Sequence, residues 1–347
     1  MKSWFVAIAA LATTLVPVSW AETEEVEEEK ILTVNWYHWG EYLQPVLDVF
    51  TEKTGIPVIV TDDYDNFNTD VVLVADYKSL LEGKNFYKFD RFNDDFYAEL
   101  SEIVPEYWRD EDQRWVGVVL RGRTAIVNKH NVPESERPSS ILDLADPKWQ
   151  GRLTLRQASN VYNRSSVAYV ISRYGEEEAT RWVNGMVANL EGAAYLNDIE
   201  QAFAIANGEY DVGFMNTYYL GYLPDWWGED EPENVQAVAD NIEVVWLDDG
   251  FGQFMNVTGV AIAAPVLKGT ENHRQAQELI RFLLSQEGQA LLSEHIFKYP
   301  VRADTPPSEY LQSHGEFKLD EFDVNDLRYL YGTADRIMAE AGWETEF

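Results

Sequence analysis

Apolar and polar positions along the first third of the chain follow a pattern typical of mixed strands and helices. The β-branched run ILTVNWY at residues 31–37 predicts a strand, and QPVLDVFTEKTG at 44–55 predicts a helix. Two further strands are predicted by IPVIV at 56–60 and TDVVLV at 69–74, and a second helix by DYKSLLEGK at 76–84. This order indicates the opening of an α/β sheet lobe.

The middle of the chain repeats the alternation. WVGVVLRGRTAIVNKH at 115–130 predicts two short β-rich runs joined by the Arg-Gly-Arg step at 121–123. SSILDLADPKW at 139–149 predicts a capped helix, GRLTLR at 151–156 a strand, and the amphipathic spacing over 165–187 helical structure. These elements predict a second α/β unit.

The last third again mixes both element types. Residues 198–221 predict a helix that stops at Gly208, then a strand that ends in a pair of adjacent tyrosines. TGVAIAAPV at 258–266 predicts a strand, and 272–295 a long helix or a helix pair. Residues 310–347 are mostly amphipathic and predict helices, and no repeat at solenoid spacing is present.

The N-terminus has the pattern of an export signal. A positive start at Lys2, the short apolar run 5–18 and small residues before Glu22 indicate a signal peptide over 1–21. Residues 22–30 form an acidic run without an apolar face, which indicates a disordered leader. We therefore expect an exported protein, free in a periplasm or tethered by a partner.

Composition narrows the class further. The chain has 347 residues, of which 46% are hydrophobic, and its formal net charge is −33. That length accommodates two lobes, and the negative field disfavours nucleic acid and anionic membranes as partners. An acidic surface of this kind is typical of adaptation to a saline, halophilic habitat. The absence of cysteine excludes disulfides, thiolate metal sites and cysteine nucleophiles.

Catalytic motifs are missing from the sequence. It contains no Gly-x-Ser-x-Gly elbow, no His-Glu-x-x-His pair and no phosphate-binding loop, and its five histidines are scattered. We therefore expect a protein that is not an enzyme. An exported hydrolase and an acidic surface protein without a small ligand stay open as alternatives.

Three long motifs together resemble one family. LADPKWQGRLTLR at 144–156, the stretch 198–221 and the stretch 258–301 are similar, in this order and spacing, to periplasmic ferric-ion-binding proteins of bacterial ABC importers. The similarity extends from about residue 30 to 345, and the string NTYYLG at 216–221 is its most specific part.

The resemblance implies an α/β, two-lobe periplasmic-binding-protein fold of type II, with a cleft between the lobes that closes around the cargo. Two crossover strands are expected near residues 120–124 and 256–261. The implied segments are lobe one at 31–121 and 258–305, and lobe two at 122–257 and 306–347.

The resemblance also implies ferric ion, Fe(3+), as cargo and Tyr218 and Tyr219 as its ligands. A hard trivalent cation prefers anionic oxygen, and it lowers the phenol pKa enough to release the proton near neutral pH. Adjacent residues on a strand point to opposite faces. Because Asn216 and Thr217 favour a helix N-cap, we expect both tyrosines in the first turn of a helix, with Asn216 itself a weaker candidate for the site.

Tyr162 is the third expected ligand. A subgroup of the family has a tyrosine at this point after a Ser-Asn pair, which Ser159 and Asn160 match. For each of these tyrosines, packing in the protein interior is the alternative role.

His38 is the expected ligand from lobe one, but the spacing from His38 to Phe50 is one residue longer than in the family. Either the loop holds a one-residue insertion or Trp39 occupies the ligand position, and a stacked residue in the cleft wall is the alternative role of His38. Because lobe one offers few ligands, His38, Tyr37 or water is expected to complete the shell. Some family members use a glutamate after the third strand, where this chain has Ala75 followed by Asp76. Asp76 is therefore a weaker candidate.

Arg121 and Arg123 are expected at the first crossing. An arginine in a cleft can hold a synergistic anion such as carbonate, and an ion pair at the hinge is the alternative role for each. Because three phenolates already neutralise Fe(3+), the ion pair is favoured. The resemblance further implies a monomer that delivers its cargo to an ABC permease in the inner membrane.

A polyamine is the main alternative cargo. WYHWGEYL resembles the opening of spermidine- and putrescine-binding proteins, in which aromatic rings and carboxylates hold the ligand. The residues suited to this role are Trp36, Trp39, Glu41 and Tyr42.

Overall fold

The structure is a computed structural model that describes residues 31–36, 40–61, 68–86, 88–192, 194–227 and 232–343. The predicted signal peptide and acidic leader lie outside these residues, as do Tyr37, His38 and Trp39. In the described ranges, no helix has the length and apolar character needed to cross a membrane.

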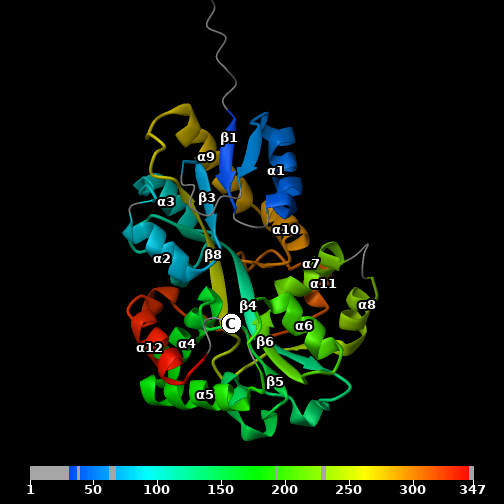
Figure 1. Cartoon of the computed structure of the whole chain (residues 1–347). Coiled ribbons are helices and arrows are strands. Elements are labelled where there is room, and N and C mark those ends of the chain that lie inside the picture. The colour runs from blue at the N-terminus through cyan, green and yellow to red at the C-terminus, as the bar shows by residue number, and fades with distance from the viewer. Residues whose placement is uncertain are drawn as a thin grey trace, which may run out of the picture. The chain divides into compact units, whose positions relative to one another are not determined.

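The first sheet region is built from short, β-branched strands. β1 (Leu32–Asn35) pairs in parallel with β2 (Val58–Thr61) and β3 (Val71–Val74), and β3 pairs antiparallel with β8 (Met255–Ile262). Buried valines and leucines of these strands belong to the hydrophobic core. Helices flank this part of the sheet (Figure 1). Those helices are α1 (Gly40–Thr54), α2 (Tyr77–Asn85), α3 (Asp94–Ser101), α9 (Glu271–Leu283) and α10 (Gln286–His295).

β4 (Val116–Asn128) is one continuous strand of 13 residues, so the prediction of two separate runs was wrong. Its first half pairs with β8 up to Gly122, and its second half pairs with β6 and β7 from Arg123 onward. Gly122 makes no turn here. A Cβ at this position would come within 2.6 Å of the Trp246 ring, so glycine permits close packing rather than a bend. β4 therefore runs the length of both sheet regions (Figure 1).

The second sheet region consists of the end of β4 with β6 (Val212–Asn216), β5 (Leu153–Thr154) and β7 (Ile242–Val245). The path through the described strands is β2-β1-β3-β8-β4-β6-β5, and β7 and β9 (Tyr299–Pro300) pair with β4 off this path. The helices of this part are α4 (Val161–Tyr174), α5 (Glu176–Asn189), α6 (Asp198–Ala206), α7 (Tyr218–Trp227), α8 (Pro232–Asn241) and α12 (Tyr331–Glu340). α12 packs against α4 and α5.

The predicted helix at 139–149 is replaced by two 3₁₀ turns. η3 (Ile141–Ala145) has a capping box with Ser140, and η4 (Pro147–Trp149) has Asp146 as its N-cap. Pro147 cannot donate a backbone hydrogen bond and keeps Asp146 out of helical geometry, so one continuous helix is not possible.

The C-terminal segment is less helical than predicted. It contains only α11 (Glu309–Gln312), η5 (Val324–Leu327) and α12 between residues 310 and 343. Leu319 forms a bridge to Gln253, so tertiary pairing holds this stretch extended. The sequence patterns also did not predict α3, α8 and β7. Two further 3₁₀ turns are η1 (Glu106–Trp108) and η2 (Glu134–Glu136).

Candidate metal-binding pocket

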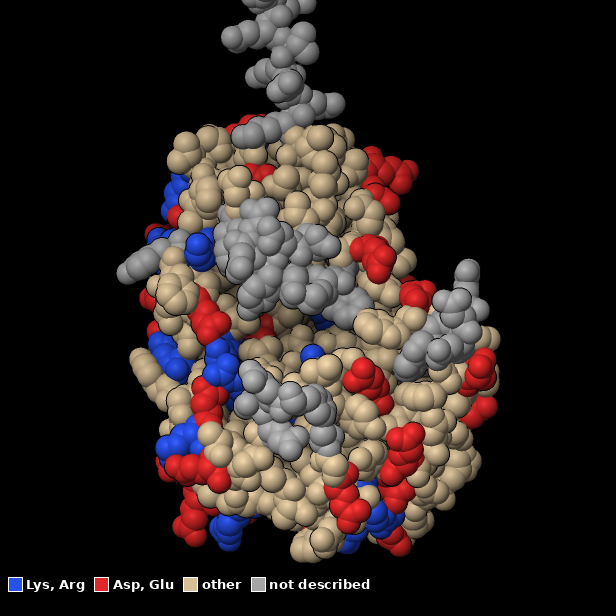
Figure 2. Space-filling model, in the orientation of Figure 1, with Lys and Arg blue, Asp and Glu red and all other residues tan. Residues whose placement is uncertain are grey.

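A pocket of about 810 Å³ lies where the two sheet regions meet. The ends of β1 and β3 and the start of α2 line one side, and the starts of α4 and α7 line the other. Figure 2 shows a hollow near the middle of this face, with basic atoms inside it and acidic residues spread over the surrounding surface.

Two helix starts bring the predicted tyrosines together. α7 begins at Tyr218, directly after β6, and the backbone N of Thr217 donates to the Gly122 carbonyl of β4. α4 begins at Val161, and its N-cap Asn160 accepts a hydrogen bond from the backbone N of Tyr162. As expected from the residues before it, the tyrosine pair occupies a first helical turn rather than a strand.

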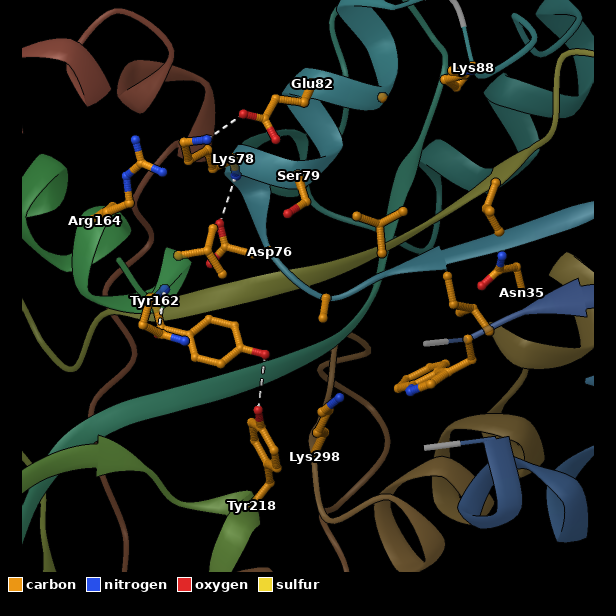
Figure 3. Close-up of a pocket in the computed structure, with 18 of the residues that line it drawn as sticks. Asn35, Asp76, Lys78, Ser79, Glu82, Lys88, Tyr162, Arg164, Tyr218 and Lys298 are labelled. Atoms are coloured by element: carbon orange, nitrogen blue, oxygen red, sulfur yellow. Dashed lines mark hydrogen bonds and ion pairs between the residues drawn. The ribbon is translucent and has the colours of Figure 1, made fainter. Parts of the chain in front are cut away.

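The phenol groups of the three tyrosines face the same space. The Tyr218 hydroxyl donates to the Tyr162 hydroxyl at 3.2 Å, as Figure 3 shows. The rings of Tyr218 and Tyr219 stack with centroids 4.4 Å apart, and both side chains line the pocket. The structure thus places two helix N-termini, and three phenols, around one cavity.

The surroundings of Tyr218 and Tyr219 favour the protonated phenol. Burial raises the pKa of Tyr218 well above its ordinary value, and the neighbouring Tyr162 adds to this effect. Burial also raises the pKa of Tyr219. A cation bound between the phenols would have to displace these protons. The cation would then supply the positive charge that a buried phenolate needs.

Two basic side chains border the phenols. Arg156 Nη1 donates to the Tyr219 hydroxyl at 3.3 Å and lies 3.9 Å from the Asp198 carboxylate. The Lys298 ammonium lies 4.5 Å from the Trp36 ring centroid and 4.9 Å from the Tyr218 ring centroid. Burial lowers the pKa of Lys298 well below its ordinary value, and Arg121 contributes to the decrease.

Asp76 has a structural role in the described arrangement. It is the N-cap of α2 and accepts from Arg121 Nη2 at 2.6 Å, Ser165 Oγ at 2.8 Å and Asn256 Nδ2 at 2.9 Å. Its carboxylate lines the pocket, but these donors occupy both oxygens. Asp76 therefore joins α2, α4 and the strands β4 and β8.

Arg121 and Arg123 both form buried ion pairs, the alternative role that the sequence left open. Arg121 pairs with Asp76, and its guanidinium carbon lies 4.6 Å from the Tyr162 ring centroid. Arg123 Nη1 lies 3.1 Å from Asp198. Asn216 donates to the same carboxylate through its backbone N and its Nδ2, and its Oδ1 is buried without a hydrogen-bond partner.

His38 and Tyr37 lie outside the described residues. Within the described ranges, no three His, Cys, Asp or Glu side chains gather as a possible metal-binding group. The donors that do gather there are the phenols.

Sequence reasoning missed Arg156 and Lys298. Arg156 follows the short strand β5, and residues just beyond the end of a strand often lie where ligands bind. This position could therefore have indicated a site residue. Lys298 is the one charge in the otherwise apolar and aromatic run IFKYPV, and a lone charge in such a run is a sign of a buried site.

A family profile described as "Bacterial extracellular solute-binding protein" matches residues 67–319. The chain belongs to this family. Iron uptake protein A1 of Synechocystis is 35% identical over 309 residues, which cover 85% of this chain and 82% of that protein. The Fe(3+)-binding periplasmic protein of Serratia marcescens is 24% identical over 352 residues, which cover 96% of each.

Solved structures agree with the family assignment. Ferric iron-binding protein A of Mannheimia haemolytica, in an open conformation, has a TM-score of 0.80 and 27% identity over 91% of this chain and 99% of that chain. A Trichodesmium protein in complex with iron and citrate ligands has a TM-score of 0.79 and 30% identity over 90% of this chain and 99% of that chain. The predicted two-lobe type II fold and the resemblance to ferric-ion-binding proteins are therefore confirmed.

Proposed function

We propose that this solute-binding protein takes up ferric ion through the phenolates of Tyr162, Tyr218 and Tyr219 and delivers it, as a periplasmic monomer, to the permease of an ABC importer. The observation that carries the proposal is the meeting of Tyr162 and Tyr218 at 3.2 Å between their hydroxyl oxygens, with Tyr219 stacked beside them. The iron-binding relatives support the same cargo.

The lobe-one ligand and the lobe bounds belong to the same proposal. His38 or its neighbour Tyr37, which follow β1, would supply the remaining ligand of the ion. Trp36, the described residue that comes just before them in the chain, lines the pocket. Lobe one would comprise residues 31–121 and 258–305, and lobe two would comprise residues 122–257 and 306–347. The change of partner on β4 between Gly122 and Arg123, and the packing of α12 on α4 and α5, support these bounds.

Ferric citrate added to the purified protein is expected to produce a visible charge-transfer band from phenolate to iron. The reason is that phenolate is the strongest anionic oxygen donor gathered in the pocket. Absorption spectroscopy measures the band directly. A colourless complex, or no complex, would contradict the proposal.

Iron affinity is expected to fall as the pH falls. Burial raises the pKa of Tyr218 and Tyr219, so each enters binding with its proton and must release it to the solvent. Each proton released weakens apparent binding about tenfold per pH unit, so the protons of the three phenols give about a thousandfold per unit in the range from about pH 8 to pH 6. Competition titration against a chelator of known pH dependence measures the slope. A flat profile would show that the phenols do not deprotonate.

A polyamine fits the pocket less well. Among the described residues suited to a polyamine, Trp36 lines the pocket. The Lys298 side-chain nitrogen already lies over the Trp36 ring. Tyr42 packs against Tyr222 with ring centroids 4.3 Å apart. The Lys298 side chain therefore occupies the ring face that a polyamine would need. Spermidine is therefore expected to leave the melting temperature unchanged, whereas ferric citrate raises it by mass action.

A further inference from the structure

One buried carboxylate, that of Asp198, holds the chain just before α7. Asp198 is the first residue of α6, and none of its surface is exposed. Its Oδ2 accepts hydrogen bonds from the backbone N and from Nδ2 of Asn216, at 3.1 and 3.2 Å. Asn216 ends β6, two residues before α7 begins at Tyr218. The position of the first turn of α7, which carries Tyr218 and Tyr219, therefore depends on Asp198.

Arg156 connects the same carboxylate to the phenol of Tyr219. Its Nη1 lies 3.9 Å from Asp198 Oδ1 and donates a hydrogen bond to the Tyr219 hydroxyl at 3.3 Å. Its guanidinium carbon lies 6.0 Å from the Tyr219 ring centroid and 5.9 Å from the Tyr162 ring centroid. Tyr219 is thus tied to Asp198 twice, at its hydroxyl through Arg156 and at its helix start through Asn216.

The backbone of Arg156 is held independently of its side chain. Its carbonyl accepts hydrogen bonds from Asn163 Nδ2 and Trp343 Nε1, both at 2.9 Å. Asn163 in turn accepts from Arg123 Nη2 at 2.6 Å, and Arg123 Nη1 lies 3.1 Å from Asp198. A planar guanidinium on a fixed backbone can donate only in a few directions. Arg156 therefore offers the phenol a donor in a defined place.

A phenol that binds an ion benefits from such a donor. Stacking on Tyr218 restrains the ring plane of Tyr219, but offset stacking allows the two rings to slide past each other. A hydrogen bond at the oxygen restricts both distance and direction at the atom that would contact the ion. Groups that hydrogen-bond to metal ligands orient those ligands, and their loss typically weakens metal binding by about 10- to 100-fold.

We propose that Arg156 is a positioning residue for the ferric ion, which is held by Asp198 and keeps the Tyr219 oxygen directed at the ion that Tyr162 and Tyr218 share. This inference rests on the proposed ferric function. Arg156 does not bind the ion itself, because a guanidinium has hydrogen-bond donors but no acceptor. It acts through one atom, the Tyr219 oxygen, and loss of that atom should therefore remove its effect.

A double-mutant cycle tests this dependence. Arg156→Met is expected to weaken ferric binding about 10- to 100-fold in the otherwise unmodified protein. In a Tyr219→Phe protein, which lacks the hydroxyl, the same substitution should change the affinity by less than about twofold, because two residues that act through one contact are not additive. Competition titration with citrate measures the four affinities. A side chain that only supports the fold would cost the same in both proteins.

The colour of the iron complex reports the same contact. A charge-assisted hydrogen bond stabilises the electrons of a phenolate oxygen, so its loss in Arg156→Met should move the charge-transfer band to longer wavelength. Arg156→Lys keeps a cationic donor and should return the band part of the way. Arg152→Met is the matched control, because Arg152 lies at the other end of β5 and pairs with Asp211. Its loss should change neither the band nor the affinity.

Three outcomes would overturn the inference. They are an unchanged band and affinity in Arg156→Met, an equal loss of affinity with and without the Tyr219 hydroxyl, and an equal loss in Arg152→Met. Arg156→Gln, also uncharged, serves in place of Arg156→Met if that variant does not fold by circular dichroism. Absence of the iron band from the unmodified protein would instead refute the proposed function, so the two failures are distinguishable.

Discussion

Tyr218→Phe and Tyr219→Phe each abolish or shift the visible iron band and weaken ferric binding at least about 100-fold. Removal of a residue that only supports a metal ligand typically costs 10- to 100-fold, and removal of the ligand itself should exceed this range. Both rings are buried in the first turn of α7, and phenylalanine keeps their packing, so the fold should be retained. Absorption spectra and competition titration with citrate measure the two effects.

Tyr222→Phe is the matched control for these variants. Tyr222 is buried on the same helix, but its hydroxyl donates to the Ile296 carbonyl at 3.1 Å. Its loss should leave the band and the affinity unchanged. If Tyr218→Phe and Tyr219→Phe both colour like the unmodified protein, the phenols of α7 do not bind the ion.

Arg121→Ala should lower the free energy of unfolding by about 3–5 kcal/mol, because it leaves the Asp76 carboxylate buried without its cation. Both side chains are about 1% exposed, and the pair joins β4 to the N-cap of α2. Burial raises the pKa of Asp76, and the Arg121 guanidinium is the largest of the interactions that oppose this increase, so the variant removes most of the compensation for burial. Urea denaturation followed by circular dichroism measures the change.

Two controls separate this effect from a general loss of charge. Arg281→Ala removes the exposed pair with Glu99 and should cost at most about 1 kcal/mol. The double variant Asp76→Asn with Arg121→Met removes both buried charges and should recover part of the lost stability. An Arg121→Ala protein as stable as the Arg281→Ala protein would show that the buried pair contributes little.

Local patterns predicted most strands and helices but not their lengths. The Arg-Gly-Arg step at 121–123 has the composition of a break between strands, yet β4 continues through it. The arginines are tolerated in the sheet because Asp76 and Asp198, distant in sequence, neutralise them. A pattern of neighbouring residues does not reveal ion-pair partners that are distant in the sequence. The same holds for residues 313–323, where an amphipathic pattern predicted helix and the bridge to Gln253 holds the chain extended.

The sequence by itself determined the alternation of most α/β elements and the absence of thiolate chemistry, because each follows from the residues present and their neighbours along the chain. It also predicted a helix start at Tyr218, although Asn216 lies in β6 and donates to Asp198 instead of capping α7. Only the tertiary structure decided that Tyr162 meets Tyr218 and that Lys298 and Arg156 border the same phenols. Those contacts depend on how β4 and β6 set the helix starts relative to each other. Ligand geometry and charge balance in the pocket are therefore properties of the folded chain, since they join residues that no local interaction holds together.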